Sequence, residues 1–541
     1  MCGICVIWGQ DTSQLPKCLE SLKARGPDSS THTFLSTKIA IGFTRLRIQG
    51  PVECDQPYQV HNSTVACNGE IFNSTQLIET LGLSVPEGSS DCAVIPAMLE
   101  KGMTLAEVSR QLDGDFAIVH VNTDSGLIEV SRDPYGVRPL YYAKGPTWSA
   151  ISSELKGLPD EALYVITVDP GTTMTFDITR EGDREFSAMV LDAISNNTIK
   201  TDRWHQVPWL KIPGLPPSAI KEALEAAVKK RLTTVRGIGA CLSGGLDSSL
   251  VAAIASRLMK DKGPIHTYSI GMEGSPDLEH ARLVAEHIGS CHHERIVTPD
   301  ECLAAIPDVV RAVETCDITT IRASVGNYLL GQFIAKETPD VKVILNGDGA
   351  DEALGGYLYM RRAPDDVAFE TETTRLLTEI HMYDVARSER SMAAHGLESR
   401  SPFLDRQFIS TARGYRTSLL RPTETRMEKT LLREAFKDTG ILPEKVLWRR
   451  KEAFSDGISK AETSWYEMAK AEGLKQAGSD WETKARAYTV NTPKTPEAYW
   501  YRKLFHTWYT PHTAVTPAMW MPRFMDGASD PSARTLGLYK V

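Results

Sequence analysis

The sequence predicts two domains: an amino-terminal domain of mixed α and β structure (α+β) and a carboxyl-terminal α/β domain with a parallel sheet. At 541 residues the chain is too long for one hydrophobic core. Its hydrophobic pattern changes near residue 216, from short apolar runs to apolar positions four residues apart. Beyond that point a glycine-rich loop separates a short apolar run from a helical pattern, which is typical of α/β domains.

In the amino-terminal part, residues 1–185, three apolar runs predict strands at residues 39–43, 116–121 and 163–168. An Asp-Pro-Gly turn signal follows the last of them. A weakly patterned stretch near residues 183–216 then runs into a segment rich in proline and glycine. We interpret that stretch as a linker region.

In the carboxyl-terminal part, Ile220, Leu224, Val228 and Leu232 are spaced four apart and predict one face of an amphipathic helix. Buried strands are expected at residues 238–242, 266–270 and 341–345, with a helix around residues 250–255. Strands that alternate with helices predict a doubly wound parallel sheet. Residues 370–510 are expected to be mostly helical.

Composition narrows the class of protein. Hydrophobic residues make up 42% of the chain and charged residues 24%, which is ordinary for a soluble globular protein. A net charge of −9 argues against nucleic-acid binding. Ten cysteines without disulfide-framework spacing fit a reducing compartment, so a cytoplasmic location is expected. No signal peptide and no run of 18 apolar residues is visible, so no membrane association is expected.

Cys2 is the first candidate catalytic residue. Removal of Met1 would leave its thiol beside a free α-amine, with reference pKa values of roughly 8.5 and 8. The amine can then serve as the base that activates the thiol. Two other interpretations are an ordinary terminal residue and, with Cys5, a redox or zinc pair. Zinc would need further ligands, and we do not expect the adjacent residues of the other cluster, Cys291-His292-His293, to converge on one ion.

A glycine-rich loop, Ser243-Gly244-Gly245-Leu246-Asp247-Ser248-Ser249, lies between the strand at 238–242 and the next helix. Backbone N–H groups, the helix N-terminus and serine hydroxyls suit a phosphate, although this is not a Walker A loop. Asp247 would repel a bare phosphate, so a divalent cation is expected to bridge them. A plain glycine-rich turn with a serine cap is the alternative.

A second loop, residues 346–352, follows the strand at 341–345 and is expected at the same edge of the sheet. Asp247 and Asp351 would then share Mg²⁺ with the β- and γ-phosphates of a nucleotide. A solvated acidic turn is the alternative interpretation.

Six segments carry a resemblance that covers nearly the whole chain: Cys2-Gly3-Ile4, Arg25-Gly26-Pro27-Asp28, Asn68-Gly69-Glu70, residues 243–249, residues 346–352 and Lys451-Glu452-Ala453-Phe454. Together they resemble the glutamine-dependent asparagine synthetases. The resemblance implies an N-terminal nucleophile hydrolase domain, an αββα sandwich of the class II glutamine amidotransferase kind, at residues 2–190. It also implies an ATP-pyrophosphatase-type synthetase domain at residues 205–525 and a tunnel that carries ammonia.

For the glutaminase half, the resemblance implies that Cys2 is the nucleophile. The Asn68 side chain and the Gly69 N–H would form the oxyanion hole. Arg45 would bind the substrate carboxylate with its planar guanidinium, and Glu70 and Asp91 would bind the ammonium. The full set expected to bind glutamine is Arg45, Leu46, Ile48, Asn68, Gly69, Glu70 and Asp91.

For the synthetase half, the resemblance gives Asp348 a role in adenylation and ammonia attack. Lys451 would neutralise charge on the phosphates; nearby Trp448 and Phe454 favour its burial over an ordinary surface position. The set expected to bind ATP is Leu242, Ser243, Gly244, Gly245, Asp247, Ser248, Ile270, Asn346 and Gly347.

The sequence departs from the family pattern at a few positions. Asp348 stands where the family often has Glu, which shortens the side chain by one methylene. Ala24 and Thr44 replace histidines that precede Arg25 and Arg45, and Gln49-Gly50 replaces Val-Asp. The last three changes touch the rim of the expected glutamine pocket and could alter glutamine affinity without removing the chemistry.

The expected reaction is ATP-dependent synthesis of asparagine from aspartate through a β-aspartyl-adenylate, with ammonia from glutamine, giving glutamate, AMP and pyrophosphate. The expected partners are thus small molecules: aspartate, glutamine and ATP with Mg²⁺. Two alternatives stay open, an amidotransferase with another carboxylate acceptor and a non-catalytic relative. β-Lactam synthetases generally lack the terminal cysteine, so Cys2 argues against that branch. Assembly as a homodimer is also open.

Overall fold

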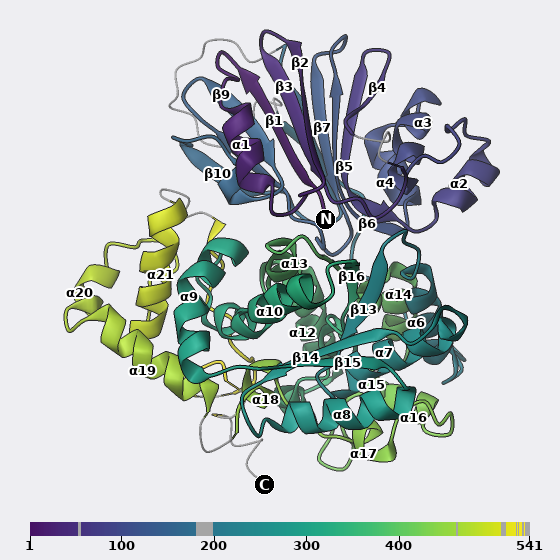
Figure 1. The fold of residues 1–541 in the computed structure, drawn as a ribbon, viewed down its shortest axis with the longest axis vertical. Coiled ribbons are helices and arrows are strands. Elements are labelled where there is room, and N and C mark those ends of the chain that lie inside the picture. Colours follow the sequence, from purple (N-terminus) through teal and green to yellow (C-terminus); the bar gives the residue numbers. More distant parts are fainter. Residues whose placement is uncertain are drawn as a thin grey trace. The chain divides into compact units, whose positions relative to one another are not determined.

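The computed structural model describes residues 1–51, 56–179, 199–460, 464–509, 515–525, 527–528, 530–532 and 535. The chain divides into two compact units, each described here by itself (Figure 1). Unit 1 comprises Met1–Gln206 and Tyr509–Val515, and unit 2 comprises Val207–Trp508 and Thr516–Val541.

Unit 1 contains two six-stranded antiparallel sheets. The first has the order β10 (Tyr164–Thr167), β8 (Tyr141–Lys144), β9 (Trp148–Ser152), β1 (Gly3–Gly9), β3 (Ile39–Arg45) and β2 (Ser29–Ser36). The second has the order β12 (Ile199–Arg203), β11 (Thr172–Asp177), β7 (Leu127–Arg132), β6 (Gly114–Asn122), β5 (Ser63–Ile71) and β4 (Tyr58–Val60). The strands predicted at 39–43, 116–121 and 163–168 are confirmed as β3, β6 and β10.

These sheets pack face to face and form the core of unit 1. Ile4, Trp8 and Ile41 of the first sheet share one apolar cluster with Val119 and Phe176 of the second. Helix α1 (Leu15–Leu22) covers the first sheet, whereas α2 (Ser74–Leu81), α3 (Val94–Glu100) and α4 (Leu105–Gln111) cover the second (Figure 1). Both faces of each sheet are therefore covered, and the αββα sandwich is confirmed.

Residues 183–198 of the predicted linker near 183–216 lie outside the described residues, and the prediction is wrong for the segment that follows them. Residues 199–203 form β12, which pairs antiparallel with β11 at the edge of the second sheet. Only Ile199 in this strand is buried and the next four residues are exposed, so the segment has no apolar alternation. Backbone pairing with β11 specifies this strand, and pairing of that kind leaves no local signal in the sequence.

Unit 2 contains one five-stranded parallel sheet, as predicted. Its order is β15 (Cys291–Ile296), β14 (His266–Gly271), β13 (Gly237–Cys241), β16 (Val341–Leu345) and β17 (Glu398–Arg400). The chain leaves β13 toward β14 and β15, and later returns to β16 on the other side. The switch point therefore lies between β13 and β16, where ligands bind in open α/β sheets.

Helices surround this sheet in unit 2 (Figure 1). Helix α6 (Ala219–Lys230) buries Ile220, Leu224 and Val228 as the spacing predicts, and α7 (Leu246–Leu258) follows the glycine-rich loop. Helices also recur through residues 370–510, as expected, although the short strand β17 interrupts them. The others are α8 (Pro276–Ile288), α9 (Pro299–Val313), α10 (Ile318–Glu337), α11 (Ala350–Leu354), α12 (Asp366–Glu379), α13 (Asp384–Ala393), α14 (Arg406–Gly414), α15 (Thr417–Leu420), α16 (Thr430–Phe436), α17 (Glu444–Leu447), α18 (Phe454–Gly457), α19 (Trp465–Ala477), α20 (Trp481–Ala485) and α21 (Pro496–Tyr509).

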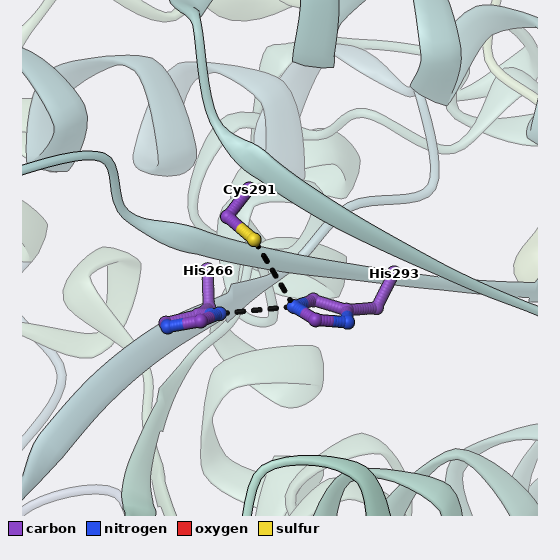
Figure 2. A group of neighbouring side chains, drawn as sticks. All are labelled: His266, Cys291 and His293. Carbon is purple, nitrogen blue, oxygen red and sulfur yellow. Dashed lines mark hydrogen bonds between the residues drawn. The ribbon is translucent and has the colours of Figure 1, made fainter.

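The expectation that the adjacent residues Cys291, His292 and His293 do not converge is confirmed for His292, but the ligand atoms of Cys291 and His293 lie close together. Cys291 and His293 are two residues apart on β15, so their side chains lie on the same face of the sheet. His266, the first residue of the neighbouring strand β14, pairs with Cys291 and completes a compact group (Figure 2). Adjacent His292 lies on the opposite face, where it bonds Thr267 and Ser269.

Among the described residues, no helix combines the length and the apolar character that a membrane crossing requires.

Candidate active sites

The first site lies where the two sheets of unit 1 meet. Cys2 immediately precedes β1, and its backbone N–H donates to Asn68 Oδ1 on β5 at 2.9 Å. The Cys2 thiol lies 3.8 Å from the carbonyl oxygen of Leu46, just after β3. Two predicted glutamine-binding residues thus contact the predicted nucleophile.

Asn68, which accepts a hydrogen bond from the Cys2 backbone, also holds an unused donor. The residue is 0% exposed, and its Nδ2 has no hydrogen-bond partner among the described residues. Its Oδ1 is fixed by Cys2, so the amide cannot turn away without losing that bond. At the next position a Cβ on Gly69 would lie 2.4 Å from the carbonyl oxygen of Asp115, so the approach of β6 requires glycine there. The arrangement can donate a hydrogen bond to negative charge that develops next to the Cys2 sulfur.

Arg25 fixes the backbone of Cys2, a role that the sequence did not assign. Its Nε donates to the Cys2 carbonyl oxygen at 2.9 Å, and its Nη1 donates to Glu154 Oε1 at 2.7 Å. Burial opposes the charge on Glu154, but Lys156 and Arg25 lower its pKa to about 2. The Glu154 carboxylate therefore stays ionised and holds the Arg25 guanidinium in contact with the Cys2 carbonyl oxygen.

Gln49 lies between two of the predicted substrate-binding groups. Arg45 Nη2 donates to the Gln49 carbonyl oxygen at 3.0 Å, and Gln49 Nε2 donates to Glu70 Oε2 at 2.5 Å. One carboxylate oxygen of Asp91 accepts a hydrogen bond from the Ile71 N–H, also at 2.5 Å. Gln49, which departs from the family pattern, thus donates its amide hydrogen bond to Glu70. The resemblance assigns the carboxylate of Glu70 to the ammonium group of the substrate.

The second site is a cavity of about 220 Å³ in unit 2, at the carboxyl ends of β13 and β16. Most of the predicted ATP-binding residues line it. They are Leu242, Ser243, Gly245, Asp247, Ser248, Ile270, Asn346 and Gly347. Asp348, Asp351 and Lys451 line it as well. Gly244 is the exception: its φ is 69°, and a Cβ would lie 2.5 Å from the Ala281 N, so its backbone packs against α8.

The two predicted loops touch at this switch point. Ser243 N–H donates to Ser248 Oγ at 3.2 Å, which closes the first loop over the start of α7. A Cβ on Gly347 would lie 2.7 Å from the Ser248 N, so glycine permits the contact between the loops. Backbone N–H groups and the helix N-terminus then face one space, the arrangement that binds phosphate.

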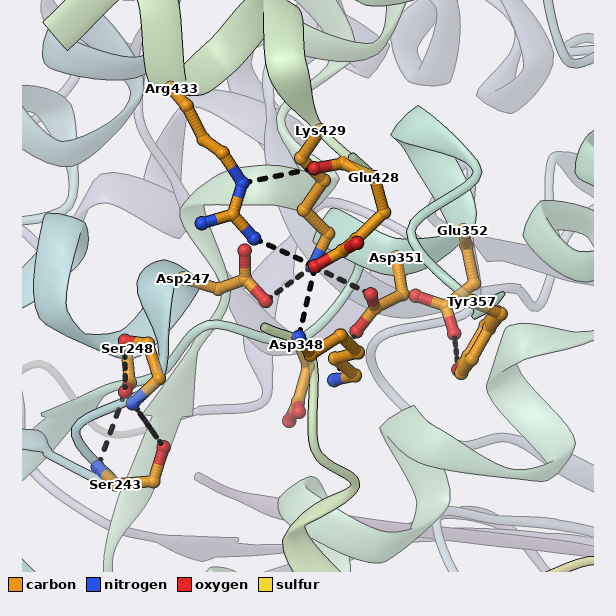
Figure 3. A network of polar contacts seen from close by, with 12 residues as sticks. Ser243, Asp247, Ser248, Asp348, Asp351, Glu352, Tyr357, Glu428, Lys429 and Arg433 are labelled. Carbon is orange, nitrogen blue, oxygen red and sulfur yellow. Dashed lines mark hydrogen bonds and ion pairs between the residues drawn. The ribbon is translucent and has the colours of Figure 1, made fainter. Parts of the chain in front are cut away.

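Charged residues converge beside these loops (Figure 3). Lys429 Nζ lies 2.6 Å from Asp247 Oδ2 and 2.6 Å from Asp351 Oδ1. Lys451 Nζ lies 2.7 Å from Asp351 Oδ2 and is partly buried. The sequence analysis missed Lys429, because it stands in an irregular segment that matches no motif and is 182 positions from Asp247.

Asp247 and Asp351 also have the chemistry of a cation site. Both carboxylates contact the Lys429 ammonium group, and Asp247 Oδ1 is buried without a hydrogen-bond partner among the described residues. Burial raises the pKa of Asp247, whereas Lys429 and Lys451 overcome burial and lower the pKa of Asp351. Oxygen donors of this kind are the ligands that Mg²⁺ prefers, so the residues fit the ion.

Two further carboxyl groups differ in their surroundings. Asp348 forms an ion pair with Arg387 at 2.7 Å, and Arg387 also contacts Asp384. Glu352 is buried and accepts a hydrogen bond from the Tyr357 hydroxyl. Burial raises the pKa of Glu352 to about 8, and the nearby charge of Asp384 adds to the rise. Glu352, which the sequence analysis did not single out, can therefore exchange a proton near neutral pH.

The fold and the two sites define a glutamine amidotransferase joined to a nucleotide-dependent synthetase. The family model described as a glutamine amidotransferase domain matches residues 1–187, and the model described as asparagine synthase matches residues 219–368 and 361–524. The chain belongs to the family of glutamine-hydrolysing asparagine synthetases.

Curated relatives match from end to end. The asparagine synthetase [glutamine-hydrolyzing] of Gallus gallus is 39% identical over 100% of this chain and 99% of its own length. The proteins of the same name from Cricetulus griseus and Homo sapiens are each 38% identical, with the same coverage.

Proposed function

We propose that this chain makes asparagine from aspartate and ATP, with ammonia that it releases from glutamine. The products are glutamate, AMP and pyrophosphate. One observation carries the proposal: a single chain holds an N-terminal cysteine hydrogen-bonded to a buried amide with an unused donor and, separately, a phosphate-type loop beside one buried and one partly buried lysine.

In the glutaminase step, the α-amine of Cys2, freed by loss of Met1, accepts the thiol proton. The sulfur attacks the carbonyl carbon of the side-chain amide of glutamine, and the carbon–nitrogen bond breaks as ammonia leaves with that proton. Water then hydrolyses the thioester to glutamate. Asn68 Nδ2 and the Gly69 N–H donate to the oxyanion, and the unpartnered state of Asn68 Nδ2 supports this role. Arg45, Leu46, Ile48, Glu70 and Asp91 complete the glutamine pocket.

In the synthetase step, the ATP phosphates lie against the Ser243–Ser248 loop. The β-carboxylate of aspartate attacks the α-phosphorus, and pyrophosphate leaves. Lys429 and Lys451 offset the negative charge that gathers on the phosphates, and their positions beside Asp247 and Asp351 in the cavity support this role. Mg²⁺, when bound, would be held by Asp247 and Asp351 and would neutralise phosphate charge.

In the amide-forming step, ammonia attacks the carbonyl carbon of the activated aspartate side chain, and AMP leaves. The attacking nitrogen must lose a proton. Glu352 is suited to accept it, because a pKa near 8 leaves part of the population ionised near neutral pH. Asp348, held by Arg387, orients the reacting groups.

The proposal also covers the organisation and setting of the protein. The catalytic domains are residues 2–190 and 205–525, the enzyme acts in the cytoplasm, and its partners are aspartate, glutamine and ATP. Sedimentation velocity decides between a monomer and the homodimer that the sequence leaves open.

The test compares the protein with Cys2→Ala. Each receives ATP, Mg²⁺ and aspartate with either glutamine or ammonium chloride, and asparagine and AMP are measured by mass spectrometry. The variant is expected to lose only the glutamine-driven reaction. If neither protein makes asparagine from ammonia, aspartate is not the acceptor and the proposal fails.

A further inference from the structure

Three potential metal ligands gather away from both sites described above. His266 begins β14, and Cys291 and His293 lie on β15, the edge strand of the parallel sheet (Figure 2). His266 pairs with Cys291 and Tyr268 pairs with His293 in the strand register. The three side chains therefore share one face at the amino ends of two neighbouring strands.

The distances between the ligand atoms approach those of a metal site. His266 Nδ1 lies 2.9 Å from His293 Nε2, and Cys291 Sγ lies 3.5 Å from the same nitrogen. All three atoms lie within 4.8 Å of one another. In a tetrahedral zinc site, bonds of about 2.0 Å to nitrogen and 2.3 Å to sulfur separate the ligand atoms by roughly 3.3–3.6 Å. Side-chain movements on the order of 1 Å would bring the three atoms to those separations.

The surroundings orient one of the ligands and leave the cluster open to solvent. The His293 ring stacks on His266 at 5.2 Å and on Tyr268 at 5.1 Å, so its orientation is set before any ion binds. Cys291 is exposed and both histidines are partly buried, so an ion can enter from solvent and keep a water ligand.

We propose that His266, Cys291 and His293 bind one divalent late transition-metal ion, with Zn²⁺ as the first candidate. Imidazole and thiolate are the ligands that Zn²⁺ favours, and three protein ligands leave the fourth position for water. On binding, the Cys291 thiol gives its proton to solvent and the thiolate bonds the metal, so affinity rises with pH.

This ion would act through structure and not in the synthetase chemistry. The cluster lies at the amino ends of β14 and β15, whereas the nucleotide loops follow the carboxyl ends of β13 and β16. Five residue steps along β14 separate the two edges by roughly 16 Å. The bound ion ties the edge strand β15 to β14, and it fixes His293 against Tyr268, a residue that lines the nucleotide cavity.

Cobalt titration tests the proposal, because Co²⁺ replaces Zn²⁺ and is coloured. The full chain is reduced, freed of metal by a chelator and titrated with Co²⁺ without ATP. We expect one equivalent to bind with tetrahedral absorption bands and a thiolate-to-cobalt band, and Zn²⁺ to displace it. Cys291→Ser removes the thiolate band, and His266→Ala weakens binding by more than about tenfold.

His292→Ala is the matched control, since His292 neighbours two of the ligands but lies on the opposite face. This variant is expected to keep the spectrum and the stoichiometry. Zn²⁺ should also raise the Tm of the unaltered protein and of His292→Ala, but not of Cys291→Ser. If the unaltered protein and Cys291→Ser bind Co²⁺ with the same spectrum and stoichiometry, the ion lies elsewhere and the proposal is overturned.

Discussion

Lys429 places one ammonium nitrogen 2.6 Å from a carboxylate oxygen of Asp247 and 2.6 Å from one of Asp351. The lysine side chain is only 2% exposed. It joins the loops that follow β13 and β16, and so balances two carboxylates that would otherwise repel each other at the switch point.

Lys429→Met is expected to abolish asparagine synthesis from ammonia as well as from glutamine. Losing one partner of a buried ion pair also costs roughly 3–5 kcal/mol of stability. Glutamine hydrolysis in unit 1 should persist. Both half-reactions and the urea midpoint are measured, with Lys437→Met as control, since Lys437 forms an exposed pair with Glu434. Normal synthesis by Lys429→Met would show that Lys429 does not serve the phosphates.

Asn68→Ala is expected to lower kcat for glutamine hydrolysis by about 10²–10³, because it removes one oxyanion donor. Ammonia-dependent synthesis should be unchanged. Steady-state assays of glutamate and asparagine separate the two effects. Asn62→Ala, at an exposed turn, serves as the control. An equal loss of both reactions would indicate misfolding and not a lost donor.

Gln49→Ala is expected to lower KM for glutamine by about tenfold or more, with kcat nearly unchanged. The substitution frees Glu70 from its hydrogen bond with the Gln49 amide, and a hydrogen bond to a charged group contributes roughly 1.5–3 kcal/mol in net terms. Glutaminase kinetics check this, with Gln59→Ala on β4 as the exposed control. A rise in KM would show instead that the amide helps to hold substrate.

Glu352→Gln is expected to change how stability depends on pH. Between the ordinary pKa of a glutamic acid and about 8, the folded state keeps a proton that the unfolded state releases. Wild-type stability therefore falls as pH rises through this window, by up to about 1.4 kcal/mol per pH unit, and levels off above it.

The glutamine side chain cannot titrate, so Glu352→Gln should gain stability relative to the unaltered protein as pH approaches 8. Urea midpoints across the window measure the difference, and carboxyl groups that do not interact with Glu352 cancel in the comparison. Glu286→Gln, on the exposed face of α8, should follow the unaltered protein. Parallel curves for Glu352→Gln and the unaltered protein would contradict the raised pKa.

Local pattern predicted much of the fold. The strands β3, β6, β13, β14 and β16 follow from short apolar runs, and α6 follows from apolar positions four apart. The glycine-rich loop after β13 and the acidic loop after β16 were expected at one sheet edge, where the structure places them. These features are visible because each depends on neighbours in the sequence.

Long-range contacts were not visible in the same way. Strand β12 has one buried residue and depends on backbone pairing with β11. The contact of Gln49 with Glu70 spans 21 positions, and His266 meets His293 across 27. Neither contact matches a sequence motif. In the sequence, Gln49 is visible only as a departure from the family pattern, and His293 only as part of a local Cys/His cluster.

By itself, the sequence determined the two domain types, the candidate nucleophile Cys2 and the two loops of the nucleotide cavity, because hydrophobic period, glycine placement and motif chemistry act over a few neighbouring residues. Only the tertiary structure decided that Lys429 lies between Asp247 and Asp351, that Asn68 keeps a free donor beside Cys2, and that Cys291 and His293 meet His266. Those relationships depend on strand order and register, which bring distant side chains together through packing of the whole domain.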